Sequence, residues 1–169
     1  MKTALRWYER AAKQDYLPAK RSLGLVLARD GIDAKRGYHI LLELAEKGDT
    51  QAQGLLGTYL LRKTIPSYSK EFHLPGTPEE GLKWLHRAAD KKDTLAAQVL
   101  MRWYRDRGAL SEGYFWDLVV AGLFGEPGPR ILPPISKQLS EKKRVDIERR
   151  AAVWLKARGI APMHTIKTK

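Results

Sequence analysis

The residues that most often carry catalysis or bind metal ions are few in this chain and lie far apart. The four histidines are His39, His73, His86 and His164, and no two of them stand at the spacing of metal ligands. Cysteine is absent, which excludes disulfides and thiolate metal sites. The sequence also contains no phosphate-binding loop, no glycine-rich dinucleotide turn and no nucleophile elbow. We therefore expect a protein without catalytic residues, cofactor or metal ion.

Glu79 and Glu80 are adjacent carboxylates, a pair that acid–base catalysis can use. They follow Thr77 and Pro78, and this order is typical of the start of a helix. Threonine serves as the N-cap, proline occupies the first helical position, and a glutamate reaches back to complete a capping box. We favour the capping interpretation over catalysis.

Positive charge is the strongest feature of the composition. The chain of 169 residues carries a net charge of +12, and the charge is uneven. Ser136–Lys169 holds ten Lys and Arg against three acids, a net +7, and the other 135 residues hold +5. Such a patch attracts an acidic partner, which could be a protein, a nucleic acid or an anionic lipid surface. The alternative is a solvated helix that only keeps this end of the chain soluble.

The elements that must position these charges repeat along the chain. Trp7–Gly24 aligns without a gap on Trp84–Met101, Ile40–Gly57 is a third copy, and a fourth begins at Trp116. The same alanine marks each copy, at Ala12, Ala45, Ala89 and Ala121, with steps of 33, 44 and 32 residues. A period in the thirties is the signature of a helical solenoid.

Each copy predicts a helix, a short break and a second helix, because its apolar residues recur at helical spacing. Two of the breaks contain Asp-Thr, at Asp49 and Asp93, which predicts a side-chain cap for the following helix. Gly24 and Gly57 recur inside a helix, which predicts close helix contact. The expected helices are Thr3–Gln14, Leu17–Asp30, Asp33–Lys47, Thr50–Lys63, Pro78–Lys92, Thr94–Arg107, Ser111–Phe124 and Ser136–Arg158.

Three segments are expected along the chain. Residues 1–125 form the repeat array, in which 64–77 is an irregular insertion that explains the 44-residue step. Residues 126–135 form a connector, because proline and glycine prevent a helix there. Residues 136–169 form a basic capping helix and tail, with Ile147, Ala151, Trp154 and Leu155 on one stripe.

The repeat resembles the Sel1-like family of tetratricopeptide-like proteins over roughly Thr3–Gly125. The A-x-x-x-L-G motif stands at Ala19–Gly24 and Ala52–Gly57, and Ala96–Met101 matches it with Met in place of Gly. The family motif also contains an aromatic residue. This chain has it only at Tyr104, and its absence from the other copies is a departure from the family pattern. The resemblance implies an all-α, right-handed α-solenoid that binds other proteins. Some small bacterial members of this family are immunity proteins that neutralise secreted antibacterial effectors, including lipases.

Three groups of residues are candidates for partner binding. Solenoids present a concave surface lined by the first helix of each pair, and basic residues occupy its non-core positions here. The insertion adds aromatic side chains that the repeat does not need, although Phe72 could instead tuck back over the groove between helices. The candidates are Lys20, Arg21, Arg62, Arg102 and Arg105 on the first helices, Tyr68, Phe72 and His73 in the insertion, and Lys142, Lys143 and Arg144 in the basic tail.

The sequence favours a non-catalytic module that binds an acidic protein, and it leaves nucleic-acid or anionic-surface binding open as the alternative. No apolar run is long enough for a transmembrane helix, and no signal peptide is visible. The repeat array starts in the middle of a copy, so either the first helix packs inward with one face only or the natural chain begins before Met1, and we favour the second. The expected location is the bacterial periplasm if a leader is removed, and otherwise the cytoplasm. Partner identity and oligomeric state stay open.

Overall fold

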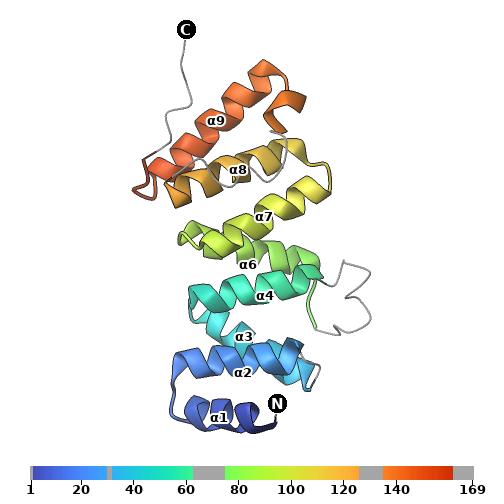
Figure 1. Cartoon of the computed structure of the whole chain (residues 1–169), viewed down its shortest axis with the longest axis vertical. Helices are drawn as coiled ribbons and strands as arrows, with labels where there is room; N and C mark the ends of the chain where they lie inside the picture. Colours follow the sequence, from blue (N-terminus) through green and yellow to red (C-terminus); the bar gives the residue numbers. More distant parts are fainter. Residues whose placement is uncertain (1, 30–31, 63–74, 126–134, 162–169) are drawn as a thin grey trace. The chain divides into compact units, whose positions relative to one another are not determined.

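Residues 2–29, 32–62, 75–125 and 135–161 are described by the computed structural model (Figure 1). They form eight α-helices and one short 3-10 helix, and these described residues contain no strand. The prediction of an all-α chain is confirmed. The chain divides into two compact units, Met1–Lys91 and Lys92–Lys169, and the boundary falls inside the expected repeat segment.

Unit 1 consists of helices that pack on their neighbours in sequence. Helix α1 packs on α2, α2 on α3, α3 on α4, and α4 on α6, the next described helix. Their bounds are α1 (Lys2–Lys13), α2 (Leu17–Arg29), α3 (Ala34–Glu46), α4 (Thr50–Arg62) and α6 (Pro78–Asp90). Each expected helix of this unit is present, with ends within a few residues of the prediction.

The helix starts follow the predicted caps. The Thr77 hydroxyl accepts a hydrogen bond from the Glu80 N–H at 3.2 Å, and the Glu80 carboxylate accepts one from the Thr77 N–H at 3.0 Å. This capping box confirms the structural interpretation of the glutamate pair. The Asp49 carboxylate accepts from the Ala52 N–H at 2.7 Å, and Asp93 caps its helix in the same way at 2.8 Å.

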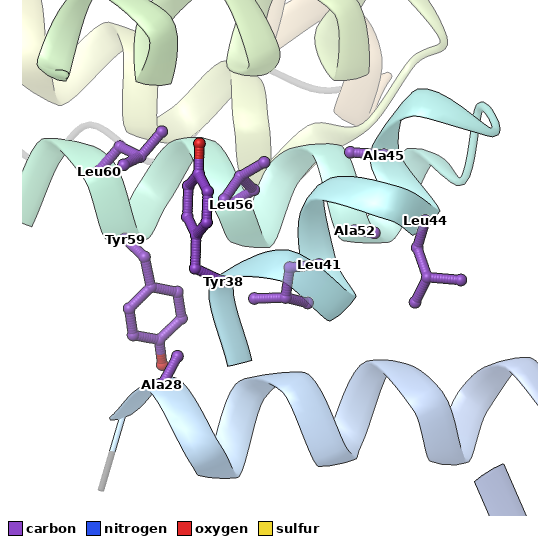
Figure 2. Close-up of a cluster of buried hydrophobic side chains, with 9 residues drawn as sticks. All are labelled: Ala28, Tyr38, Leu41, Leu44, Ala45, Ala52, Leu56, Tyr59 and Leu60. Carbon is purple, nitrogen blue, oxygen red and sulfur yellow. The ribbon is translucent and has the colours of Figure 1, made fainter. Parts of the chain in front are cut away.

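The core of unit 1 is a cluster of alanine, leucine and tyrosine side chains from α2, α3 and α4 (Figure 2). The marker alanine Ala45 is buried in it, and Tyr59 extends from α4 toward Ala28 of α2. The cluster contains Ala28, Tyr38, Leu41, Leu44, Ala45, Ala52, Leu56, Tyr59 and Leu60. Removal of this apolar surface from water is the main force that holds these short helices together, because isolated helices of this length are marginal.

Glycines allow two helix pairs of unit 1 to approach at the same repeat position. A Cβ atom at Gly37 of α3 would lie 2.6 Å from the carbonyl oxygen of Gly24 of α2. A Cβ atom at Gly57 of α4 would lie 2.7 Å from the carbonyl oxygen of Gly81 of α6. The close contact expected at Gly24 and Gly57 is confirmed, and each has a glycine partner on the facing helix.

Unit 2 contains α7 (Thr94–Asp106), α8 (Leu110–Phe124), the 3-10 helix η1 (Ile135–Gln138) and α9 (Glu141–Lys156). Helix α8 packs on α7, on η1 and on α9. The expected helices at α7 and α8 are confirmed. Residues 126–134 of the predicted connector and 162–169 of the predicted tail lie outside the described residues.

The prediction of one continuous helix over Ser136–Arg158 is wrong. The chain forms η1, leaves helical geometry, and restarts as α9 at Glu141, with Ser140 as the N-cap. The Ser140 hydroxyl accepts from the Lys143 N–H at 3.5 Å, and a serine N-cap favours a helix start because it satisfies a free backbone donor. Of the predicted apolar stripe, Ile147, Ala151 and Leu155 are buried, and Trp154 is half-buried.

Candidate partner-binding surface

The predicted basic residues of unit 1 are held by contacts inside the molecule. Arg21 of α2 forms an ion pair of 2.6 Å with Asp49, the residue that caps α4. Their side chains are only 20% and 13% exposed. Lys20 pairs with Asp15, and the Arg62 guanidinium lies 5.3 Å from the centre of the Tyr59 ring. Arg21 therefore has a clear role in joining α2 to the start of α4.

The two predicted arginines of α7 differ. Arg105 pairs with Asp117 of α8 at 3.4 Å, and its side chain is 12% exposed, whereas Arg102 is exposed. Burial raises the pKa of the Asp117 carboxyl, and the Arg105 guanidinium opposes that rise. Arg105 thus compensates a carboxylate taken partly out of water, which is a structural role.

The aromatic residues predicted in the insertion, Tyr68, Phe72 and His73, lie outside the described residues. Their part in partner binding stays a prediction.

Two of the three predicted basic residues at the start of α9 are exposed. Lys142 and Lys143 are exposed in the first turn, and Arg144 is half-buried, 3.9 Å from Glu148. Glu148 in turn accepts a hydrogen bond of 2.8 Å from the hydroxyl of Tyr114 on α8. Helix α9 carries six Lys and Arg against three acids, so its basic character does not depend on the residues beyond its end.

Sequence reasoning missed an apolar component on the same helix. Val145 and Val153 are 50% and 64% exposed, and Arg149 stands between them in the sequence. The spacing of four residues places all three along one face. This face lies away from Ile147 and Ala151, whose side chains are buried. Two valines at exposed positions of a highly charged helix were the sequence signal for this surface.

An open hollow of about 500 Å³ adjoins this face within unit 2. Its lining includes Phe115 of α8 together with Arg149, Arg150, Val153, Trp154 and Arg158. Aromatic carbon and aliphatic carbon thus meet three guanidinium groups in one concave area. Such a surface can bind an apolar group that carries a negative charge beside it.

The aromatic faces at this hollow are covered by arginine. The Arg158 guanidinium carbon lies 3.7 Å from the centre of the Trp154 ring, and that of Arg150 lies 5.3 Å from the centre of the Phe115 ring. The Trp154 ring also meets the buried Trp116 edge to face at 5.9 Å. Cation–π contacts of this kind fix both the ring and the charge.

A second hollow, of about 350 Å³, lies among α1, α2 and α3 in unit 1. Its charged lining residues have both signs, because Glu9 and Glu43 accompany Lys13, Lys20 and Arg36. Arg36 already pairs with Glu9 at 3.1 Å. These side chains sum to a net charge of only +1, whereas the lining of the first hollow has three arginines and no acid, so the second hollow is the weaker candidate.

Other kinds of site find no support in the described part of the chain. No group of three or more metal-ligating side chains gathers there. None of the helices described is long and apolar enough to cross a membrane. In comparisons with known proteins, no family model, no curated protein and no solved structure matches the chain. The resemblance to Sel1-like repeats therefore stays a prediction from the sequence.

Proposed function

We propose that this chain is a non-catalytic module that binds a protein with an acidic surface, and that α9 carries the contact. The observation that supports this most directly is the combination on α9 of exposed cations with exposed valines. Lys142 and Lys143 are exposed in its first turn, and Val145 and Val153 follow on its outer side. Protein interfaces pair an apolar centre with charges that steer the encounter, and α9 offers both.

The arrangement of the repeats extends the proposal. The recurring alanines, glycines and capped helices are those expected of a right-handed Sel1-like solenoid, a scaffold used for protein binding. By this resemblance the acidic partner would be a secreted antibacterial effector, such as a lipase, and the chain would be its immunity protein. Arg102, which is exposed on α7, would add to the basic surface.

Nucleic acid is the second candidate, because the net charge of +12 suits a polyanion. The two classes differ in how affinity responds to salt. Affinity for a folded protein partner depends on a few buried anchor residues, and charge mainly sets the association rate. Affinity for nucleic acid comes mostly from phosphate neutralisation, so it falls steeply and linearly on a log–log plot against salt.

The test has two parts. The chain is copurified from its native host to identify the partner, and it is titrated against random duplex and single-stranded oligonucleotides at about 0.15 M salt, where the Debye length is about 8 Å. We expect a protein partner and no oligonucleotide binding at micromolar concentration. Micromolar or tighter binding of random oligonucleotides would overturn the proposal.

A charge-reversal variant locates the contact. Lys142→Glu, Lys143→Glu and Arg144→Glu together should slow association with the protein partner and reduce its salt dependence, while the complex survives at moderate salt. The first turn of a helix tolerates acidic residues because the helix dipole favours them there. The matched control reverses three exposed lysines of unit 1, Lys13, Lys35 and Lys83, and makes the same change in net charge. An equal effect of the two triple variants would show that net charge, and not α9, governs binding.

A further inference from the structure

Resting on the function proposed above, we infer that the outer side of α9 is a docking seam for an amphipathic helix of the partner. The partner helix would carry aliphatic side chains along its centre and carboxylates on both sides. We define the outer seam as Lys142, Val145, Arg149, Val153 and Lys156.

The geometry of the seam fits a helix. Its five residues follow one another at steps of three, four, four and three, which keeps them on one face of α9. The face buried on α8 carries Ile147, Ala151 and Leu155 instead, so the outer seam is not used by the fold. From end to end the seam spans roughly 21 Å at 1.5 Å per residue, about four helical turns.

The apolar part of the seam has no explanation in the folding of unit 2. Val145 and Val153 are 50% and 64% exposed. Valine loses side-chain freedom in a helix, so it is a poorer choice than lysine or glutamate for an exposed position. Val153 also lines the hollow of about 500 Å³, together with Phe115 and Trp154. A single aliphatic or aromatic side chain from the partner would extend the seam into this hollow.

The charges of the seam select carboxylates. Arg149 lies between the two valines, and Lys142 and Lys156 stand at the ends. Two acids close to it are already paired, Asp146 with Arg149 at 2.7 Å and Glu112 with Arg150 at 3.4 Å. Both pairs are solvent-exposed and are worth little, so carboxylates of a partner can replace them.

Two other occupants fit the seam less well. Single-stranded nucleic acid binds by stacking its bases on aromatic faces. Here Arg158 covers Trp154, Arg150 lies over Phe115, and the exposed apolar residues are valines. A second copy of the chain docked by two-fold symmetry would place like charges, such as Arg149 and its copy, against each other.

The probe for the test is a fluorescent peptide of about 20 residues, long enough to form a helix. It has leucines at steps of three and four, glutamates on both sides of them, and alanine elsewhere. A peptide of the same composition in scrambled order is its control. Fluorescence anisotropy is measured with the full chain at about 0.15 M salt, and a single-stranded oligonucleotide with the same label is titrated in parallel.

The decisive variant is Val145→Ser with Val153→Ser, which removes the apolar anchors and leaves every charge in place. Its matched control is Leu95→Ser, because Leu95 is 70% exposed on α7 of the same unit. We expect the double variant to bind the ordered peptide at least about tenfold more weakly, from the lost burial of two aliphatic side chains. Leu95→Ser should change the affinity less than about twofold.

Each of the following outcomes would contradict the inference that a partner helix docks on the outer seam. Equal affinity for the ordered and scrambled peptides would show that charge alone binds. An unchanged affinity in the double variant would show that the valines are not the anchors. If neither peptide binds while copurification yields an acidic protein whose affinity the double variant leaves unchanged, the seam is wrong and the proposed function stands. Tighter binding of the oligonucleotide than of the peptide would overturn both the seam and the proposed function.

Discussion

Substitution of Gly57 by alanine tests whether the paired glycines set the distance between helices. A mid-helix glycine normally costs about 1 kcal/mol relative to alanine, so helix propensity alone predicts that Gly57→Ala stabilises the protein. The structure predicts the opposite. A Cβ atom at this position would lie 2.7 Å from the carbonyl oxygen of Gly81 and 2.6 Å from Cγ of Leu85.

The loss of stability can be estimated from the movement of α6 that an added Cβ atom would require. The Gly81 oxygen belongs to the backbone, so it cannot rotate away as a flexible side chain would. Helix α6 would have to retreat by roughly 0.8 Å to reach an ordinary contact distance. That movement would loosen Leu85, Ala88 and Ala89, which are fully buried. Overpacking typically costs about 1–3 kcal/mol. Because backbone must move here, we expect the upper part of that range, about 2–3 kcal/mol, and subtraction of the propensity gain of about 1 kcal/mol leaves a net loss of about 1–2 kcal/mol.

The assay is thermal unfolding followed by far-ultraviolet circular dichroism, with urea unfolding at neutral pH as a second measure. For a chain of this size, a loss of about 1–2 kcal/mol lowers Tm by about 2–8 °C. The control is Gln51→Ala at an exposed position of the same helix, which should change the free energy of unfolding by less than about 0.5 kcal/mol. A Gly57→Ala protein with a Tm at or above that of the wild type would refute the close-contact explanation.

Three further perturbations test other contacts. Ala45→Glu should abolish cooperative thermal unfolding, because it buries an unpaired charge in the unit 1 core, and wild-type melting would show that the repeat alignment is out of phase. Arg21→Ala should lower the free energy of unfolding, measured in urea, by about 1–2 kcal/mol, because it leaves the partly buried Asp49 carboxylate without its ion-pair partner. Arg36→Ala removes an exposed ion pair and should lower it by less than about 1 kcal/mol. Tyr114→Phe tests how the stability of the protein depends on pH. Burial, and then the hydrogen bond to a carboxylate of α9, raises the pKa of Tyr114, so the folded state holds its proton above pH 10 while the unfolded state, with a pKa near 10, releases it. The free energy of unfolding of the wild type, measured in urea titrations, should therefore fall as pH rises above about 10. The variant should be less stable than the wild type by about 1 kcal/mol at neutral pH and should show a smaller fall. Parallel falls in both proteins would contradict this explanation.

Local signals of the sequence predicted most of the helix boundaries in the described part of the chain. The capping box at Thr77 and the caps at Asp49 and Asp93 depend only on residues within three positions of each other, so the chain order reveals them. The break at Ser140 has the same kind of signal, a serine before a charged helix. The prediction of one continuous helix over Ser136–Arg158 overlooked this signal.

The sequence allowed one glycine of each close helix contact to be predicted, but not its partner on the facing helix. Gly24 and Gly57 stood out because each lies in the recognised motif, but their partners Gly37 and Gly81 lie early in the facing helices. Gly37, Gly81 and the buried Gly113 follow each other at steps of 44 and 32, the same steps as the marker alanines. The spacing was available in the sequence, but the reason for a glycine there is the approach of a second backbone, which only the packed structure shows.

The basic residues show why charge alone could not locate the binding surface. A count of Lys and Arg treats Arg21, Arg105 and Lys142 alike, because each adds one positive charge. The packed helices separate them, since folding brings Asp49 to Arg21 and Asp117 to Arg105 from other helices or their caps. Those two arginines compensate carboxylates that folding removes from water, so their charges are already used within the units. The cations of α9 also have acidic neighbours, as in the Arg149–Asp146 pair, but that pair is exposed and lies beside exposed valines. This association of exposed apolar surface with accessible charge, not the total of +12, is the reason for proposing α9 as the surface for an acidic protein.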